Sequence, residues 1–379
     1  MSQHFSSPPR LVLGDGALDQ FAGELTHLGS RALIVTDPGI VAAGILDIVS
    51  GVLATSGMPI EVFSDVIGNP DVATVDAANQ ARGAARADIL IALGGGSSMD
   101  VAKAVAVLAT NGGTIADYEG VDKFGTRPLP VIAIPTTVGS GSEVTKGAVI
   151  TNPDTHVKMV IVSDLMFATI AVLDRRVVAG LPGRIAATTG MDALTHAIEA
   201  YVSKGANPIT DAINIGAIEI IGQNLVAASQ GDADALYNML VASCMAGIGF
   251  HDAGLGAVHA LANTIGAQFG VHHGTANALF LPYVMDFNLI SSPARFARIA
   301  RALGEDTTGL TDERAAQLAA SAVHRLAEQT GVPRKLSEVG VPAEAIDELA
   351  AAALVQADLP GNPREASLAD ITALYRKAL

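Results

Sequence analysis

Residues 87–109, ADILIALGGGSSMDVAKAVAVLA, decide the fold of this chain. The apolar run ADILIAL has the length and composition of a buried strand, and MDVAKAVAVLA has the spacing of a helix. The two are joined only by the glycine- and serine-rich turn at 94–98. A strand that passes directly into a helix is typical of a β–α–β unit, so this stretch predicts a parallel sheet covered by helices.

The same pattern extends on both sides of this stretch. Further short β-rich runs lie at 31–37, 59–65, 129–137 and 169–174. Runs with helical spacing and polar or glycine ends separate the first three strands, which predicts a mostly parallel sheet with helices on both faces. After residue 180 one helical pattern follows another. We therefore predict two domains: an α/β domain at 1–180 and an all-helical domain at 181–379.

The composition argues against several classes of function. The formal net charge of -15 disfavours a partner with a phosphate backbone, such as DNA or RNA. Charged residues, glycine and proline interrupt the apolar runs, so we expect no membrane-spanning segment. The only cysteine, Cys244, excludes an intrachain disulfide, and the first residues lack the apolar core of a signal peptide. These features predict a cytoplasmic protein without a nucleic-acid or membrane partner.

The glycine-rich turn is a candidate phosphate site. Gly94, Gly95, Gly96, Ser97 and Ser98 precede a helix, where bare backbone N–H groups and the positive end of the helix dipole can hold an anion. The G-x-G-x-x-G fingerprint is absent, and a tight strand-to-helix turn also uses glycine for steric reasons alone. Both interpretations remain open on this turn.

Two neighbouring segments favour a nucleotide. Asp37 ends a strand, where its carboxylate could accept both hydroxyls of an adenosine ribose and repel a 2′-phosphate, which favours NAD over NADP. It could equally cap a helix that begins at Pro38. The loop 134–145 offers further hydroxyls and glycine N–H groups after another buried strand. All three segments follow strand carboxyl ends, where ligands bind in open α/β sheets.

A metal site is indicated in the helical half. In GMDALTHAIEAY (190–201), Asp192 and His196 are four residues apart, so on a helix both lie on one face. Two polar residues on the solvent-exposed face of any amphipathic helix have the same spacing, so this interpretation also stays open. Four of the nine histidines lie between His251 and His273. Three imidazoles and one carboxylate suit Fe²⁺ or Zn²⁺, with a coordination position left for a substrate.

Taken together, these motifs resemble the iron-containing (group III) alcohol dehydrogenase family. The resemblance covers nearly the whole chain and is carried by LIVTD, GGGSSMDVAKA, AIPTTVGSGSEVT, GMDALTHAIEAY, NPITDA, GLGAVHALA, HHGTANALFLPY and GNPREASLADI. It implies a Rossmann-like α/β domain followed by a helical domain, as in the dehydroquinate synthase-like fold. It also implies an NAD(H)- and metal-dependent oxidoreductase that interconverts short primary alcohols or diols and aldehydes.

The resemblance also implies roles for individual residues. The metal ligands would be Asp192, His196, His259 and His273, with Fe²⁺ expected and Zn²⁺ possible. The cofactor-binding positions would be Asp37, Asn69, Gly95, Gly96, Ser97, Thr136, Thr137, Ser140, Val149 and Lys158. Most relatives form dimers or larger rings, so we expect a homo-oligomer and favour a dimer.

This chain departs from the family pattern where protons are handled. Asn263 stands where many relatives have a second histidine, near the nicotinamide, and an amide cannot exchange protons at neutral pH. His251, in Phe-His-Asp-Ala, replaces a common serine, and His272 replaces a common proline. We therefore expect His251 or His272 to take over the proton relay.

Other functions remain as alternatives. Glycerol and hydroxy-acid dehydrogenases resemble this chain, as does dehydroquinate synthase, a lyase that should carry several basic residues for its phosphorylated substrate. Few basic residues lie near the candidate ligands in 181–379. The intact set of one aspartate and three histidines argues against metal-free relatives and against a non-catalytic NAD-binding protein.

Overall fold

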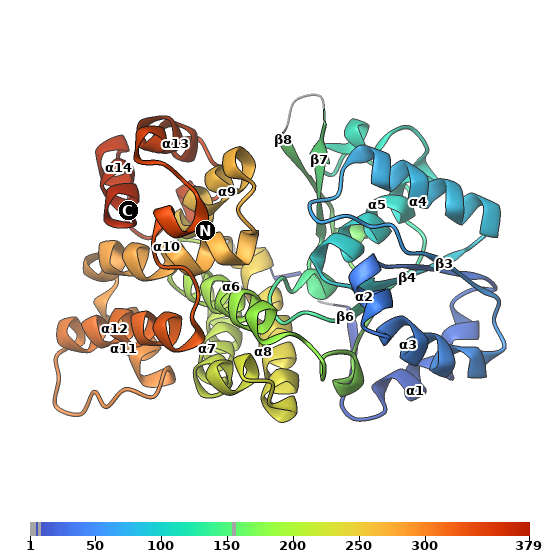
Figure 1. Cartoon of the computed structure of the whole chain (residues 1–379), viewed down its shortest axis with the longest axis horizontal. Helices are drawn as coiled ribbons and strands as arrows, with labels where there is room; N and C mark the ends of the chain where they lie inside the picture. Colours follow the sequence, from blue (N-terminus) through green and yellow to red (C-terminus); the bar gives the residue numbers. More distant parts are fainter. Residues whose placement is uncertain (1–4, 7–8, 154–156) are drawn as a thin grey trace. The chain divides into compact units, whose positions relative to one another are not determined.

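The computed structural model describes residues 5–6, 9–153 and 157–379 (Figure 1). The chain divides into two compact units. The α/β unit contains 6–137 and 141–180, and the helical unit contains 138–140 and 181–379 together with Phe5. The tripeptide Val138–Ser140, which lies inside the first predicted domain, thus belongs to the helical unit.

A six-stranded parallel sheet forms the centre of the α/β unit, in the order β1-β9-β6-β4-β2-β3. The strands are β1 (Arg10–Leu13), β2 (Ala32–Val35), β3 (Ile60–Phe63), β4 (Ile89–Gly94), β6 (Val131–Pro135) and β9 (Ile170–Leu173). All five predicted strands are present, and β1 is added at one edge. The four inner strands are buried along their whole length, because helices cover both faces of a parallel sheet.

Helices and a second small sheet surround this sheet. The helices are α1 (Ala17–Ala22), α2 (Pro38–Ala42), α3 (Ile45–Leu53), α4 (Val72–Ala85) and α5 (Gly96–Asn111). The helix predicted after the glycine-rich turn is α5, and it is buried from Ser98 to Leu108 except at Asp100. The small sheet, which the sequence did not predict, consists of β5 (Gly120–Val121), β7 (Gly147–Asn152) and β8 (Val157–Val162).

The helical unit is built around one long buried helix. Helix α6 (Gly183–Val202) is buried from Ala186 to Val202 and packs against α7 (Pro208–Ser229), α8 (Ala233–Ala253) and α10 (His273–Asn288). The other helices are α9 (Ala257–Phe269), α11 (Pro293–Ala302), α12 (Asp312–Thr330), α13 (Ile346–Leu354) and α14 (Leu368–Lys377). A capping box of Ser367 and Asp370 starts α14.

Helices α7 and α8 correct one expectation. Both are long and apolar enough, by length and composition alone, to cross a membrane, so charged residues do not interrupt every such run. In the structure 33% of the apolar window of α7 and 61% of that of α8 are buried. The core helices of soluble proteins pass the same test, so these two helices are weak evidence for a membrane.

Candidate active site

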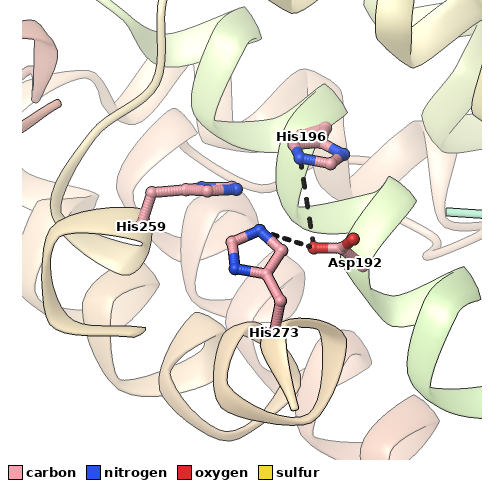
Figure 2. A group of neighbouring side chains, drawn as sticks. All are labelled: Asp192, His196, His259 and His273. Carbon is pink, nitrogen blue, oxygen red and sulfur yellow. Dashed lines mark ion pairs between the residues drawn. The ribbon is translucent and has the colours of Figure 1, made fainter. Parts of the chain in front are cut away.

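Four side chains from three helices converge inside the helical unit (Figure 2). Asp192 and His196 come from α6, His259 from the first turn of α9, and His273 from the start of α10. Their ligand atoms all lie within 4.8 Å of one another. Asp192 Oδ1 is 4.0 Å from Nε2 of His196 and 3.9 Å from Nε2 of His273. These are the four residues that the family resemblance implies as metal ligands.

Burial and charge set the protonation of these ligands. Burial lowers the pKa of His196 to about 4, which leaves the imidazole neutral and its lone pair free to bind an ion. Burial alone would raise the pKa of Asp192, but the nearby imidazoles and a hydrogen bond from Asn277 together lower it. The site therefore offers an ionised carboxylate beside a neutral imidazole.

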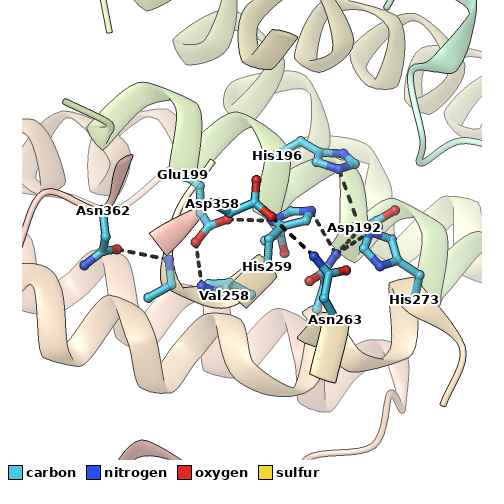
Figure 3. Close-up of polar contacts among 12 residues, drawn as sticks. Asp192, His196, Glu199, Val258, His259, Asn263, His273, Asp358 and Asn362 are labelled. Atoms are coloured by element: carbon cyan, nitrogen blue, oxygen red, sulfur yellow. Dashed lines mark hydrogen bonds and ion pairs between the residues drawn. The ribbon is translucent and has the colours of Figure 1, made fainter. Parts of the chain in front are cut away.

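Glu199 orients His259, as Figure 3 shows. Its Oε2 lies 2.6 Å from His259 Nδ1, and its Oε1 accepts a hydrogen bond of 2.6 Å from the backbone N–H of Val258. Glu199 thus also caps α9, together with Asn362, whose Oδ1 accepts from the N–H of Ala257 at 3.3 Å. When Nδ1–H donates to a carboxylate, Nε2 keeps its lone pair for an ion.

The same carboxylate changes the acidity of His259. Burial would lower the pKa of this imidazole, but the hydrogen bond and charge of Glu199, with the charges of Asp358 and Asp192, raise it above its ordinary value. His259 therefore holds a proton more readily than the neighbouring His196 does. A cation that binds Nε2 must displace that proton.

A backbone carbonyl orients His196. Its Nδ1 lies 3.2 Å from the oxygen of Gly139, and its ring stacks on Phe250 with 4.4 Å between centroids. Gly139 belongs to the tripeptide that joins the helical unit. A Cβ atom at Gly139 would come within 2.7 Å of Thr189, so the close approach of this carbonyl to α6 requires glycine.

Asn277 is a fifth polar residue at this centre. It follows His273 by one helical turn and is fully buried. Its Nδ2 lies 2.6 Å from Asp192 Oδ1 and 3.1 Å from Nε2 of both His259 and His273. Neither Asn277 nor Glu199 was identified from the sequence, although each lies three or four residues after a candidate ligand on the same helix.

The spacing of the four ligands fits one divalent cation. Tetrahedral ligands about 2.0–2.2 Å from an ion lie roughly 3.4 Å apart. The separations of 3.9 and 4.0 Å from Asp192 Oδ1 exceed this by about half an ångström, and no separation among the four ligand atoms exceeds 4.8 Å, which is about 1.4 Å more than the tetrahedral value. Small inward movements of the side chains would therefore reach coordination distance, and an Asp-His₃ donor set suits Fe²⁺ or Zn²⁺.

The three residues considered for proton handling lie in different surroundings. Asn263, one turn after His259, donates a hydrogen bond of 3.3 Å to Asp358, whose pKa is raised by burial. The His251 side chain is 2% exposed, and its Nε2 lies 3.3 Å from Asp252 Oδ2. His272 is exposed and directly precedes α10.

In the α/β unit, Asp37 lies beside the glycine-rich turn. Its Oδ1 accepts from the N–H groups of Gly39 and Ile40 and caps α2, as one of the two interpretations predicts. Its Oδ2 is 3.5 Å from Ser98 Oγ. Gly94 has a φ of 151°, and a Cβ atom there would come within 2.4 Å of that same hydroxyl, so this position requires glycine.

The first turn of α5 can receive an anion. The helix begins at Gly96, and its N-cap residue, Gly95, offers no side chain to cap it. Gly95, Gly96 and Ser97 are partly exposed although the strand before them is buried. Thr136 donates its N–H to Gly94 O at 3.0 Å, which brings the loop after β6 beside the turn. The uncapped N–H groups at this helix end are the partners that a phosphate needs.

Three other candidate cofactor residues lie close together. Lys158 donates to Asn69 Oδ1 at 3.0 Å, and the N–H of Val149 donates to Asp100 Oδ2 at 3.1 Å. Burial lowers the pKa of Lys158, while the charge of Asp100 acts in the opposite direction. The structure thus joins Asn69 to Lys158 and Val149 to Asp100, and the charges of Lys158 and Asp100 interact, whereas Ser140 belongs to the other unit.

Lys103 holds the neighbouring loop in place. The side chain is buried, and its ammonium group donates to the carbonyl oxygens of Ser142, Thr145 and Gly147 at 2.6, 2.9 and 3.0 Å. Asp100 accepts from Ser142 Oγ at 3.0 Å. Helix α5 is therefore tied to the segment between β6 and β7, which contains several candidate cofactor residues.

Comparison with known proteins identifies the same family over both units. Residues 8–175 match the model of "Iron-containing alcohol dehydrogenase", and residues 186–379 match "Fe-containing alcohol dehydrogenase family, C-terminal". The chain is 38% identical over 379 residues to the NAD-dependent methanol dehydrogenase of Bacillus methanolicus, covering 99% of this chain and 100% of the relative. It is 38% identical over 368 residues to the lactaldehyde reductase of Escherichia coli strain K12, covering 96% of each.

A solved structure agrees with these sequence matches. The crystal structure of a 1,3-propanediol oxidoreductase superimposes on this chain with a TM-score of 0.97 at 36% identity, covering 100% of both chains. The parallel-sheet domain followed by a mostly helical domain is therefore the architecture that the sequence predicted.

Proposed function

This chain belongs to the iron-containing alcohol dehydrogenase family, and from that premise we propose that it oxidises short primary alcohols or diols with NAD⁺ and reduces the corresponding aldehydes with NADH. It is an oxidoreductase that acts on CH–OH groups. Bound NAD⁺ would supply the acceptor for the hydride of the carbinol carbon, and the alcohol hydroxyl would have to give up its proton to a group of the protein or to water. The observation that carries the proposal is the convergence of Asp192, His196, His259 and His273.

We assign the metal site to these four residues, with Fe²⁺ expected and Zn²⁺ as the alternative. A bound divalent cation supplies Lewis acidity toward the substrate oxygen. Asp192 contributes the negative charge that holds the cation, and the three imidazoles contribute neutral donors. Glu199 and Gly139 keep His259 and His196 in the required orientation and tautomer.

We assign NAD(H) binding to the α/β unit. In support, the uncapped start of α5 can hold the pyrophosphate, and Asp37 next to it can hold the adenosine ribose. Gly95, Gly96, Ser97, Thr136 and Thr137 lie at or beside this turn. Lys158 with its partner Asn69, Val149 and Ser140 complete the proposed set.

We propose His251 or His272 as the group that exchanges the proton, because Asn263 cannot. His251 follows Phe250, which stacks on His196, and His272 precedes His273. Replacing each histidine with asparagine or glutamine and recording the pH profile of kcat/KM tests the assignment. Unchanged profiles in both variants would remove both candidates.

We also propose that the protein works in the cytoplasm as a homodimer. Strand β1 is at the edge of the parallel sheet, and Leu13 at its end is 53% exposed, so this edge can meet a second copy. Light scattering of the purified protein measures the oligomeric state directly.

The relatives named for methanol, 1,3-propanediol and lactaldehyde suggest short, uncharged substrates for this chain as well.

The central experiment follows NADH oxidation with a panel of short aldehydes. Protein treated with a chelator is compared with the same protein reloaded with Fe²⁺ or Zn²⁺, and Asp192→Asn serves as a control of nearly equal size. We expect turnover to disappear with the chelator, to return with one ion, and to fail to return in the variant. Turnover that survives complete metal removal would contradict the proposed function.

A further inference from the structure

The amide of Asn277 points at atoms that a cation would use. Its Nδ2 lies within hydrogen-bond distance of Asp192 Oδ1, His259 Nε2 and His273 Nε2. An amide nitrogen carries only two hydrogens, so it cannot serve three acceptors fully at once. Three of the four candidate ligand atoms are thus held around one nitrogen, at distances longer than those of metal coordination.

The other half of this amide has no partner. Asn277 is 0% exposed, and its Oδ1 accepts no hydrogen bond in the part of the chain that the structure describes. A buried carbonyl oxygen without a donor is unfavourable unless another state of the protein uses it. A rotation of the side-chain amide by half a turn would exchange the positions of Oδ1 and Nδ2. It would bring Asn277 Oδ1 next to Asp192 Oδ1. Two oxygens so close repel each other unless a cation lies between them.

We propose that Asn277 is a positioning residue of the metal centre whose side-chain amide turns over when a divalent cation binds. In the metal-free protein, Nδ2 holds Asp192 Oδ1 and the unprotonated Nε2 atoms of His259 and His273 together. When the single Nε2 lone pairs of His259 and His273 go to the cation, Nδ2 loses two of its three acceptors, and the half-turn presents Oδ1 as an additional oxygen donor. This proposal rests on the proposed function, because it requires the four ligands to bind a cation.

Cobalt(II) is a suitable probe, because the intensity of its visible absorption bands increases as its coordination number decreases. The full-length protein is treated with a chelator and titrated with Co²⁺, and Asn277→Ala and Asn277→Asp are treated in the same way. Thermal unfolding is recorded for each protein before and after the titration. The matched control is Asn214→Ala, since Asn214 is equally buried on α7 and, among the described residues, takes no part in the hydrogen bonds of the four ligands.

The two variants should change these readouts in different ways. Asn277→Ala should lower the Tm of the chelated protein and strengthen the Co²⁺ bands, because one oxygen donor is lost. Asn277→Asp keeps the size of the side chain, but both of its terminal atoms are oxygens. An oxygen therefore faces Asp192 in either orientation. It should lower the Tm of the chelated protein further and tighten Co²⁺ binding, because it adds a second carboxylate to the site. Asn214→Ala should leave the spectrum unchanged.

Two results would overturn the proposal while leaving the proposed function intact. The first is that both Asn277 variants show the same Co²⁺ spectrum and affinity as the wild-type protein. The second is that Asn214→Ala changes the Co²⁺ spectrum in the same way as Asn277→Ala. If wild-type protein gave no Co²⁺ bands at all, the metal centre itself would be refuted, and this proposal with it.

Discussion

Asn263 donates its side-chain amide to Asp358 at 3.3 Å, one helical turn after the candidate ligand His259. The family resemblance implies a histidine at this position, and this chain instead pairs an amide with a carboxyl group. We expect Asn263→His to add an ionisation to the pH profile of kcat/KM, with a pKa above that of free imidazole because Asp358 is adjacent. Asn263→Ala is the control, and superimposable profiles for the two variants would contradict the prediction.

Glu199→Gln should weaken cation binding. Glutamine keeps the size of the side chain but cannot provide the charged acceptor that now lies 2.6 Å from His259 Nδ1. Loss of such an outer partner typically costs roughly 10–100-fold in metal affinity. Competition with a coloured chelator measures the dissociation constant. An unchanged constant would show that Glu199 serves only to cap α9.

Cation binding should release a proton near neutral pH. The pKa of His259 is raised above its ordinary value, so part of the population carries a proton that the cation must displace. Affinity should therefore increase as the pH rises toward that pKa and then level off. Calorimetry in buffers of different ionisation enthalpy counts the protons. Glu199→Gln should reduce the number, and an equal release from both proteins would contradict this account.

Asp37→Ser should relax the preference for NADH. Serine can still cap α2 in place of Asp37 Oδ1, but it carries no charge to repel a 2′-phosphate. We expect the ratio of kcat/KM for NADPH to that for NADH to rise by about tenfold or more, since opposing like charges costs several kcal/mol. Thermal unfolding should show little change. An unaltered ratio would leave Asp37 as a helix cap only.

Lys103→Met should destabilise the protein by about 3 kcal/mol or more, because buried carbonyl oxygens would lose a charged donor. The affected oxygens belong to Ser142, Thr145 and Gly147. Urea unfolding measures the change in the free energy of unfolding. Lys146→Met is the control: Lys146 pairs with the largely exposed Asp164, and we expect a loss below about 1 kcal/mol. Similar losses in both variants would refute the distinction.

The sequence predicted those parts of the fold that local pattern determines. The inner strands are continuous apolar runs, and a glycine-rich turn joins β4 directly to α5. The inner strands and α5 could therefore be located without a structure. Strands β7 and β8 were missed because their pairing with each other, rather than an uninterrupted apolar run, defines them. The expectation that charged residues interrupt every long apolar run was wrong for α7 and α8, whose apolar windows contain few charged residues.

For the site, spacing indicated Asp192 and His196, while the assignment of His259 and His273 depended on the family resemblance. Glu199 lies seven residues after Asp192 on the same helical face, so the spacing could have indicated it as well. Its partner His259, however, is 60 residues away, and no local pattern determines that contact. The same holds for Asp358, which is 95 residues from Asn263.

The place of Val138–Ser140 has a practical consequence for building hybrid enzymes. A chimera cut at residue 180 would take its metal-binding helices from one parent but the carbonyl of Gly139, which orients His196, from the other. The Gly139 carbonyl reaches His196 only because residue 139 is a glycine that passes close to Thr189 on α6. If the two parents differ on this surface of α6, the hybrid would hold the imidazole in the wrong position. Recombination between relatives should therefore transfer the tripeptide together with the helical half, so that each hybrid inherits a matched acceptor and ligand.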